Sequence, residues 1–322
     1  MNDERARIFL PFGLLIAILA VSTASIFIRF AQREAPSLVI AALRLTFASL
    51  ALAPFALTRH REELRKLTRG ELLLGLLSGI FLAIHFATWI SSLEYTSVAS
   101  SVVLVSTGPL WVALLSPIFL KEPLTKPVLV GMFLALLGGT VIGLSDSCEL
   151  TLRLLSPDGS LRSGSISCPP FAEFVQGEAF LGNFLALAGA WAVAGYLMIG
   201  RRLRGGMRLV PYIFIVYGFA AIALLGIMSA AGQSPAGFSP MTYVWILLLA
   251  LAPQLIGHST YNWALRYLPA ALVSITTLGE PIGSAILAYF ILREAPTALT
   301  IFGGALILGG IYVSSRVERR GG

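Results

Sequence analysis

Two side chains of opposite charge, Arg44 and Glu280, lie deep inside long apolar runs of this sequence. A charged side chain at the centre of a membrane helix costs about 2.5–3.5 kcal/mol, so each of these two needs a reason to be there. Arg44 carries a planar set of donors that suits a carboxylate or phosphate, and Glu280 is a group that can take up and release a proton. Two interpretations stay open. The residues form a buried ion pair between helices, or one or both face a cavity and bind a substrate or a coupling proton.

Polar and aromatic side chains recur at helical spacing in two other runs. His85 and Trp89 are four residues apart, as are His258 and Asn262, with Tyr261 beside them. Residues four apart share one face of a helix, so these faces offer hydrogen bonds and aromatic walls to a small solute. Ordinary packing is an equally good interpretation of the histidines. The predicted substrate-binding residues are Arg44, His85, Trp89, His258, Tyr261, Asn262 and Glu280, with Glu280 also as the coupling residue.

Helix-breaking residues surround the acid. Gly279 and Pro281 flank Glu280, and Pro253 lies in the preceding apolar run. A proline removes a helix hydrogen bond, and freed backbone groups within a span are tolerated where they line a cavity. Residues 107–109 (Thr-Gly-Pro) occupy the matching place earlier in the chain without an acid. This asymmetry indicates a specific role for Glu280.

Several further residues have weaker signals. Trp111, Trp191 and Tyr196 are secondary candidates for the same site, or else packing and interface residues. Glu294 and Arg29 lie at the ends of apolar runs. We expect Glu294 to form an interfacial salt bridge or a helix cap, and Arg29 to extend its charge to the membrane interface.

The composition places all these residues in a membrane protein. The chain of 322 residues is 57% hydrophobic and only 12% charged, whereas a soluble domain carries about 25% charged residues. The net charge of +7 comes from basic residues between the apolar runs. It therefore indicates orientation in a bilayer, and no nucleic-acid partner is expected.

Ten apolar runs approach the roughly 20 residues that a helix needs to cross a bilayer. They lie at 8–28, 37–57, 71–93, 98–120, 127–144, 179–200, 209–231, 241–265, 270–292 and 297–315. With the N-terminus inside, 17 Lys and Arg residues fall on the inner side and 5 on the outer side. This bias predicts a multi-pass protein of the plasma (inner) membrane with both termini cytoplasmic.

The longest connection, 145–178, is polar and faces outward on this orientation. It holds the only two cysteines, Cys148 and Cys168. Outside the cytoplasm they can form a disulfide; the alternative is two unpaired thiols. Two thiols are too few ligands for a metal site, and none is predicted.

The chain also repeats itself. A shift of 172 residues aligns the stretch after Tyr95 with the stretch after Tyr267, without a gap. Pro109 then matches Pro281, Gly131 matches Gly303 and Gly138 matches Gly310. Each half holds five spans, and an odd number inverts the second half relative to the first, as in many secondary transporters. The glycines favour close helix packing, within the chain or in a dimer.

These features resemble a known family. Leu-Gly-Glu-Pro at 278–281, Leu-Lys-Glu-Pro at 120–123 and Leu-Arg-Glu-Ala at 292–295, together with ten spans in two halves, are similar to the EamA-type drug/metabolite transporter superfamily. The resemblance implies an all-α fold, with ten transmembrane helices in two inverted five-helix repeats around a central cavity. It divides the chain into an EamA-like repeat at 1–144, a polar extracytoplasmic loop at 145–178 and a second repeat at 179–322.

We therefore predict a secondary active transporter, and specifically an exporter, of a small organic metabolite such as an amino acid. It would work by alternating access, with a proton as a candidate coupling ion, as a monomer or homodimer. No phosphate-binding Gly-Lys loop and no catalytic cluster is evident in the sequence, so no cofactor and no enzyme activity are expected. The alternatives are an intramembrane or lipid-modifying enzyme on a duplicated scaffold, and a passive channel.

Overall fold

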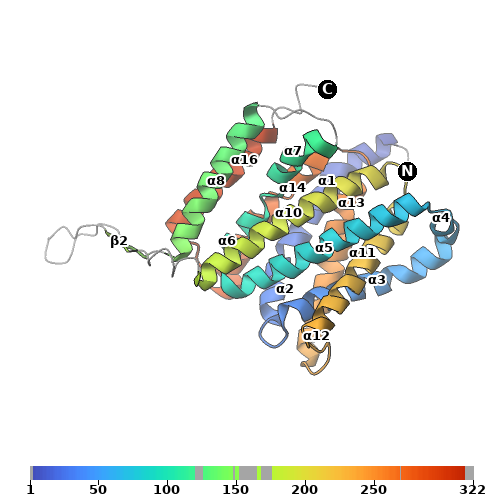
Figure 1. The fold of residues 1–322 in the computed structure, drawn as a ribbon, viewed down its shortest axis with the longest axis horizontal. Coiled ribbons are helices and arrows are strands. Elements are labelled where there is room, and N and C mark those ends of the chain that lie inside the picture. Colours follow the sequence, from blue (N-terminus) through green and yellow to red (C-terminus); the bar gives the residue numbers. More distant parts are fainter. Residues whose placement is uncertain are drawn as a thin grey trace.

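A computed structural model describes residues 3–119, 126–147, 149–151, 165–167, 176–268 and 270–315. These residues form a bundle of long helices (Figure 1). Two short strands, β1 (Glu149–Thr151) and β2 (Ser165–Ser167), pair antiparallel with Glu149 opposite Ser167. They lie within the segment that was predicted as a polar loop. The predicted disulfide between Cys148 and Cys168 lies outside the described residues.

The helices of the first half are α1 (Asp3–Ser22), α2 (Ala24–Ala31), α3 (Ser37–Arg59), α4 (Arg61–Arg65), α5 (Arg69–Tyr95), α6 (Val98–Val105), α7 (Gly108–Phe119) and α8 (Lys126–Ser147). Those of the second half are α10 (Glu178–Arg204), α11 (Leu209–Ala230), α12 (Pro240–Leu249), η1 (Ala250–His258), α13 (Ser259–Ala264), α14 (Ala270–Thr276), α15 (Gly279–Leu287), η2 (Ala288–Leu292) and α16 (Ala298–Ser315).

Seven helical stretches in the described part of the chain are long and apolar enough to cross a membrane. They are Phe9–Ala31, Ser37–Arg59, Arg69–Tyr95, Val98–Leu115, Glu178–Arg204, Leu209–Ala230 and Pro240–Ala264. There are also three shorter apolar helices. Leu129–Ile142 lies in the predicted span 127–144, Gly279–Leu292 in the span 270–292 and Ala298–Gly310 in the span 297–315. The helical membrane class of the bundle is therefore confirmed, whereas the count of ten spans stays a prediction.

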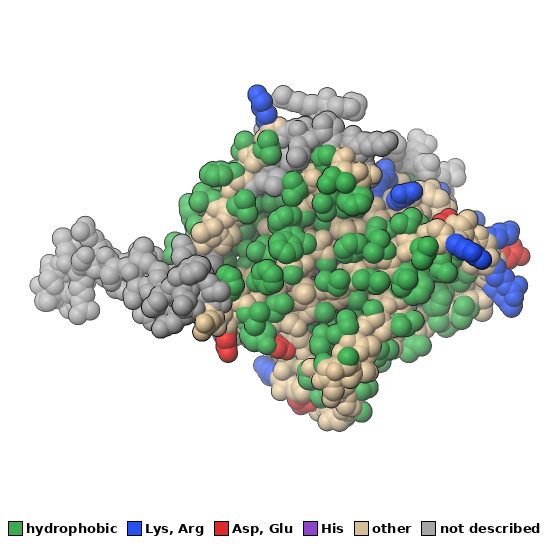
Figure 2. Space-filling view, in the orientation of Figure 1, with side chains coloured by type: hydrophobic (Ala, Val, Ile, Leu, Met, Phe, Trp, Pro, Cys, Tyr) green, Lys and Arg blue, Asp and Glu red, His purple; other side chains and the backbone are tan. Residues whose placement is uncertain are grey.

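The outer surface of the bundle is apolar. Figure 2 shows hydrophobic side chains over most of the visible face, with Lys and Arg gathered near its edges. Phe12, Leu19 and Phe133 are each more than 60% exposed. In water this surface would be unfavourable, but a bilayer solvates it.

Local sequence signals explain where several helices begin. Thr68 and Glu71 form a capping box at the start of α5, in which each side chain accepts a hydrogen bond from the other's backbone N–H. Ser239 caps α12, and Pro240 occupies its first turn, where a missing N–H costs nothing. Pro253 lies inside η1, where the backbone widens into a π-helix. This agrees with the expected distortion, because proline cannot donate to the preceding turn.

The last helices of the two halves cross at glycines. A Cβ atom on Gly138 would lie 2.5 Å from the carbonyl oxygen of Gly303, and one on Gly310 would lie 2.5 Å from that of Gly131. Residue 138 thus faces 303 while 131 faces 310, so α8 and α16 run antiparallel with their backbones in contact. Figure 1 shows the two helices side by side. The glycines serve packing within the chain, one of the two roles predicted for them.

Glu294 joins the two halves at one end of the bundle. Its carboxylate lies 3.2 Å from Arg29 and accepts a hydrogen bond of 3.0 Å from the backbone N–H of Val98, at the start of α6. Arg29 also donates to the carbonyl of Thr96. Glu294 therefore makes both interactions that its position predicted, a salt bridge and a helix cap.

A second carboxylate caps a helix in the same way. Glu34 accepts hydrogen bonds from the backbone N–H of Ser239 at 2.9 Å and from the hydroxyl of Thr242 at 2.8 Å, at the start of α12. These hydrogen bonds, above all the one from the Ser239 backbone, lower the pKa of Glu34 below its ordinary value. Since Glu34 belongs to the first half and α12 to the second, this contact also ties the halves together.

Candidate functional site

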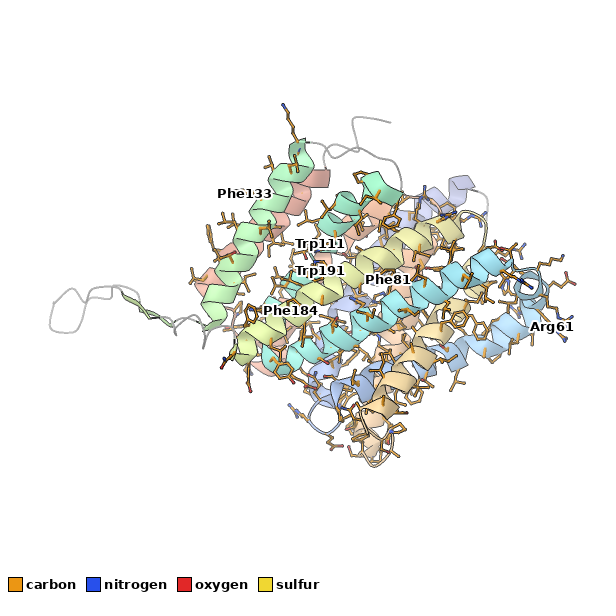
Figure 3. All side chains as sticks on the ribbon, in the orientation of Figure 1. Arg61, Phe81, Trp111, Phe133, Phe184 and Trp191 are labelled. Carbon is orange, nitrogen blue, oxygen red and sulfur yellow. The ribbon has the colours of Figure 1, made fainter. Side chains whose placement is uncertain are left out.

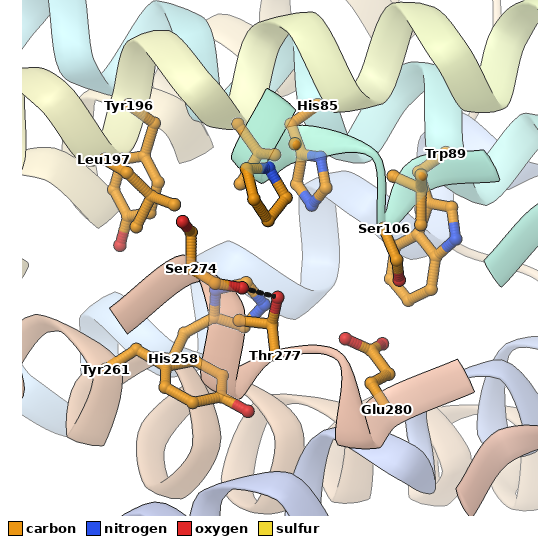
Figure 4. A pocket seen from close by; sticks show the side chains of 14 residues that line it. His85, Trp89, Ser106, Tyr196, Leu197, His258, Tyr261, Ser274, Thr277 and Glu280 are labelled. Atoms are coloured by element: carbon orange, nitrogen blue, oxygen red, sulfur yellow. Dashed lines mark hydrogen bonds between the residues drawn. The ribbon is translucent and has the colours of Figure 1, made fainter. Parts of the chain in front are cut away.

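A pocket lies at the meeting point of the two halves (Figure 4). Its volume is about 620 Å³, including its open side. The first half contributes His85, Trp89, Val105, Ser106, Gly108 and Pro109, and the second half contributes Val193, Tyr196, Leu197, His258, Tyr261, Ser274, Thr277 and Glu280. Five of the seven predicted site residues are among them. The pocket is therefore aromatic and polar, and both repeats build it.

Two interrupted helices, one from each half, line the pocket. Between α6 and α7 the chain makes a turn at residues 106–107, and between α14 and α15 it makes a turn at 277–278. These turns lie at equivalent places in the two repeats, next to Gly108-Pro109 and Gly279-Glu280-Pro281. Non-helical backbone at membrane depth is tolerated where it lines a cavity, and both turns do so.

Glu280 is the one charged side chain among the described residues that line the pocket. It sits in the first turn of α15, where the partial positive charge of a helix N-terminus favours a carboxylate. Figure 4 shows its carboxyl group pointing into the pocket. Among the described residues it forms no ion pair with Arg44, because no nitrogen of the guanidinium lies within 4.0 Å of its carboxylate oxygens. The direct buried ion pair, one of the two interpretations, is not formed in this structure.

The position of His85 is set by a hydrogen bond to α10. Its Nδ1 lies 2.9 Å from the carbonyl oxygen of Gly189. A carbonyl only accepts, so Nδ1 carries the proton and Nε2 of the neutral ring is left as an acceptor. The ring stacks on Trp89 at a centroid distance of 5.8 Å and 13° between planes. His85 and Trp89 therefore share a face of α5, as their spacing predicted.

The second histidine comes from the equivalent span of the other repeat. The ring of His258 lies 6.3 Å from that of His85 and 5.3 Å from that of Phe86, edge-on to the latter. Together these rings make an aromatic wall to which α5 and η1 both contribute.

Two buried donors near the pocket have no partner within the described chain. These are the hydroxyl of Tyr261 and the indole Nε1 of Trp89, whose side chains are 4% and 2% exposed. Buried polar atoms are normally hydrogen-bonded, so an unpaired donor at a pocket wall suggests an acceptor on a ligand or a water molecule.

Asn262 does not line the pocket. Its Nδ2 donates to the hydroxyl of Tyr196 and, at 2.8 Å, to the carbonyl oxygen of His258. It is 1% exposed and lies behind Tyr196, which does line the pocket. Its place therefore suits positioning of Tyr196 better than contact with a solute.

Arg44 is also not among the residues that line the pocket. It is completely buried, and its Nε donates to Oε1 of Gln254 at 2.9 Å. The guanidinium carbon is 3.9 Å from the centre of the Phe86 ring, which covers its face. Neither Gln254 nor Phe86 was predicted, although a glutamine after Pro253 within an apolar run was a detectable signal.

The secondary candidates divide between the pocket and the exterior. Tyr196 lines the pocket, and so do Ser106, Ser274 and Thr277, which sequence reasoning missed because small polar residues are common in spans. Trp191 is 42% exposed on the outer surface. Trp111 stacks edge-on against it at 5.3 Å, and neither residue is among those that line the pocket (both are labelled in Figure 3).

Known proteins resemble the chain over nearly its full length. An uncharacterized transporter of Archaeoglobus fulgidus is 24% identical over 305 residues, which covers 94% of this chain and 95% of the relative. The uncharacterized transporter YetK of Bacillus subtilis is 23% identical, over 93% of this chain and 85% of the relative. A crystal structure matches with a TM-score of 0.64 and 19% identity over 97% of this chain and 98% of that chain, which shows a common fold alone.

The sequence model of the EamA-like transporter family matches residues 9–144 and again residues 180–316. The two matches confirm the resemblance inferred from the duplicated motifs. The chain therefore belongs to the EamA-like transporter family, as a multi-pass helical membrane protein with two repeats of that family.

Proposed function

We propose that the protein is a secondary active transporter that exports a small organic metabolite, such as an amino acid or a related compound, by alternating access. The pocket between the repeats would be its substrate site. His85, Trp89, His258, Tyr261 and Glu280 would contact the solute, Asn262 would act through Tyr196, and Glu280 would bind and release a coupling proton.

The observation that carries this proposal is the matched pair of helix breaks beside the pocket. In secondary transporters, discontinuous helices from two repeats meet at a midplane site, and rocking of the repeats exposes that site to either side. Here α6/α7 and α14/α15 are interrupted at equivalent positions, and both breaks line one pocket. A scaffold with a purely structural role would have no need for two costly breaks at that place.

The proposed topology has ten spans in two inverted halves. It adds the three shorter apolar helices to the seven long ones. The antiparallel packing of α8 on α16 supports inversion, because these are the last helices of the two repeats. The excess of basic residues on one side supports cytoplasmic termini in the plasma membrane.

The test compares intracellular and extracellular metabolites of cells that express the wild type, Glu280→Gln, Glu178→Gln or an empty vector, at matched membrane levels. Glu178 is an exposed carboxylate at the start of α10, outside the pocket, and serves as the matched control. We expect the wild type and Glu178→Gln to lower a solute inside and raise it outside, and Glu280→Gln to lose this effect.

Two results would contradict parts of the proposal. If Glu280→Gln exports as well as the wild type, the carboxylate is not the coupling group. If no solute changes its distribution with any variant, the export assignment is wrong, and uptake assays on the same cells would test the opposite direction.

A further inference from the structure

The guanidinium of Arg44 is buried with most of its donors unused. The side chain is 0% exposed, and neither terminal nitrogen has a hydrogen-bond partner among the described residues. Only Nε is bonded, to Gln254. Buried charges are normally paired and hydrogen-bonded, because an unpaired one loses its hydration without compensation. No described residue hydrogen-bonds the two terminal nitrogens and Glu280 forms no ion pair with them, so they are available to an anionic group of a ligand.

One aromatic side chain contacts both this guanidinium and residues that line the pocket. Phe86 places its ring face 3.9 Å from the guanidinium carbon of Arg44. The same ring lies 5.3 Å from the ring of His258 and 4.8 Å from that of His85, both of which line the pocket. Phe86 therefore contacts both Arg44 and the pocket wall, and movement of its side chain would change the access of Arg44 to the pocket.

We propose that Arg44 and Phe86 form a covered anion subsite, which takes the carboxylate of a solute whose flat apolar part lies between His85, Trp89 and Tyr261. This inference rests on the proposed function, because it assigns a substrate class to the same pocket. Phe86 is then the residue that controls access to the anion site.

The chemistry of the surrounding groups fits a carboxylate. The two terminal nitrogens of a guanidinium are coplanar and bind both oxygens of a carboxylate in a fork, an arrangement that an ammonium group cannot copy. The guanidinium carbon lies over the Phe86 ring, and the two terminal nitrogens have no hydrogen-bond partner among the described residues, so they can donate to a carboxylate. The stacked rings of His85 and Trp89 supply a flat apolar surface for the rest of the solute.

The test uses three probes with the same body and different head groups: 3-phenylpropionate, 3-phenylpropionamide and 3-phenylpropylamine. Binding to the purified full-length protein in lipid nanodiscs is measured by isothermal titration calorimetry. The variants are Arg44→Met and Phe86→Ala. Phe81→Ala is the matched control, since Phe81 lies on the same helix and packs against Gly195, away from Arg44.

We expect the wild type to bind the carboxylate at least tenfold more tightly than the amide or the amine, and Arg44→Met to lose this preference. Phe86→Ala removes the cover and should strengthen binding of the carboxylate alone, severalfold. Phe81→Ala should leave the order of the three probes unchanged. If Arg44→Met does not fold, binding of the three probes to Phe86→Ala still tests the subsite.

Three results would overturn the subsite: equal binding of the three probes by the wild type, no binding of any probe, or equal weakening of all three by Phe86→Ala. The metabolite comparison separates this failure from failure of the proposed function. Export that depends on Glu280, with no carboxylate preference in the binding assay, refutes the subsite but leaves the transporter proposal intact.

Discussion

Adding one methyl group to Gly138 should force α8 and α16 apart. A Cβ atom there would lie 2.5 Å from the carbonyl oxygen of Gly303 and 2.8 Å from Cγ1 of Ile307. To restore an ordinary van der Waals contact, the helices must separate locally by roughly 1 Å. Overpacking of this kind costs about 1–3 kcal/mol. Gly138→Ala should therefore destabilise the fold.

The neighbouring glycine provides the matched control. A Cβ atom on Gly139 would lie 3.6 Å from Cδ2 of Leu104, an ordinary contact. Gly139→Ala should be neutral or stabilising, by up to about 1 kcal/mol, because alanine favours the helix. The same contrast recurs across the crossing, where a Cβ on Gly303 would lie 2.7 Å from Gly138 O but one on Gly304 would be 3.6 Å from its nearest neighbour, Val103.

The assay is the temperature at which half of the detergent-solubilised protein is lost from the monodisperse peak in size-exclusion chromatography. Gly138→Ala and Gly303→Ala should lose this peak at clearly lower temperatures than the wild type, and Gly139→Ala and Gly304→Ala should not. If the members of each pair behave alike, the backbone contact between α8 and α16 is wrong, and with it the support that this contact gives to inverted repeats.

Three further predictions concern the site and the helix caps. The double variant Arg44→Met/Gln254→Leu should melt at or above the wild-type temperature, because replacing a buried charge by apolar groups of similar volume is neutral or stabilising by about 1–4 kcal/mol. A large drop would mean that the guanidinium is retained for stability. Tyr261→Phe should leave the melting temperature unchanged, since its hydroxyl has no partner within the described residues. It should reduce the export of the solute found in the metabolite comparison, because a hydrogen bond of about 0.5–1.5 kcal/mol is lost, and unchanged export would exclude a hydrogen bond to that solute. Glu34→Gln should lower the melting temperature at neutral pH by removing the carboxylate that caps α12 through Ser239. The pKa of Glu34 is lowered in the folded state, so this difference should be fully present above the unfolded pKa and vanish as pH falls through the folded pKa. Melting curves from about pH 7 to about pH 3 would show it, and a pH-independent difference would contradict the cap.

The two intramembrane charges illustrate what could be predicted and what could not. The cost of burying Arg44 and Glu280 in lipid marked both as exceptional on sequence alone. Their relation to each other depends on the rotation of two helices that are far apart in the chain. The structure points Glu280 into the pocket and places Arg44 against Phe86, outside the residues that line the pocket. No local pattern specifies that rotation.

Helical spacing was a partial guide to the pocket. His85 and Trp89 share a face and line the pocket together, as four-residue spacing predicts. His258 and Asn262 have the same spacing but separate roles. The Asn262 amide folds back onto the carbonyl of His258 and onto Tyr196, which satisfies its donors locally and keeps it out of the pocket. The contact with Tyr196 joins α13 to α10, so spacing within one apolar run could not predict it.

The sequence by itself determined the membrane class, the apolar runs and the duplication with its family, since hydropathy and repeated motifs are properties of local sequence. The tertiary structure decided which polar side chains reach the pocket, that α8 and α16 touch at glycines, and that Glu294 and Glu34 cap helices of the opposite half. The cap contacts join residues up to 208 positions apart. They arise from the packing of all the helices against one another, which the pattern of any single helix does not contain.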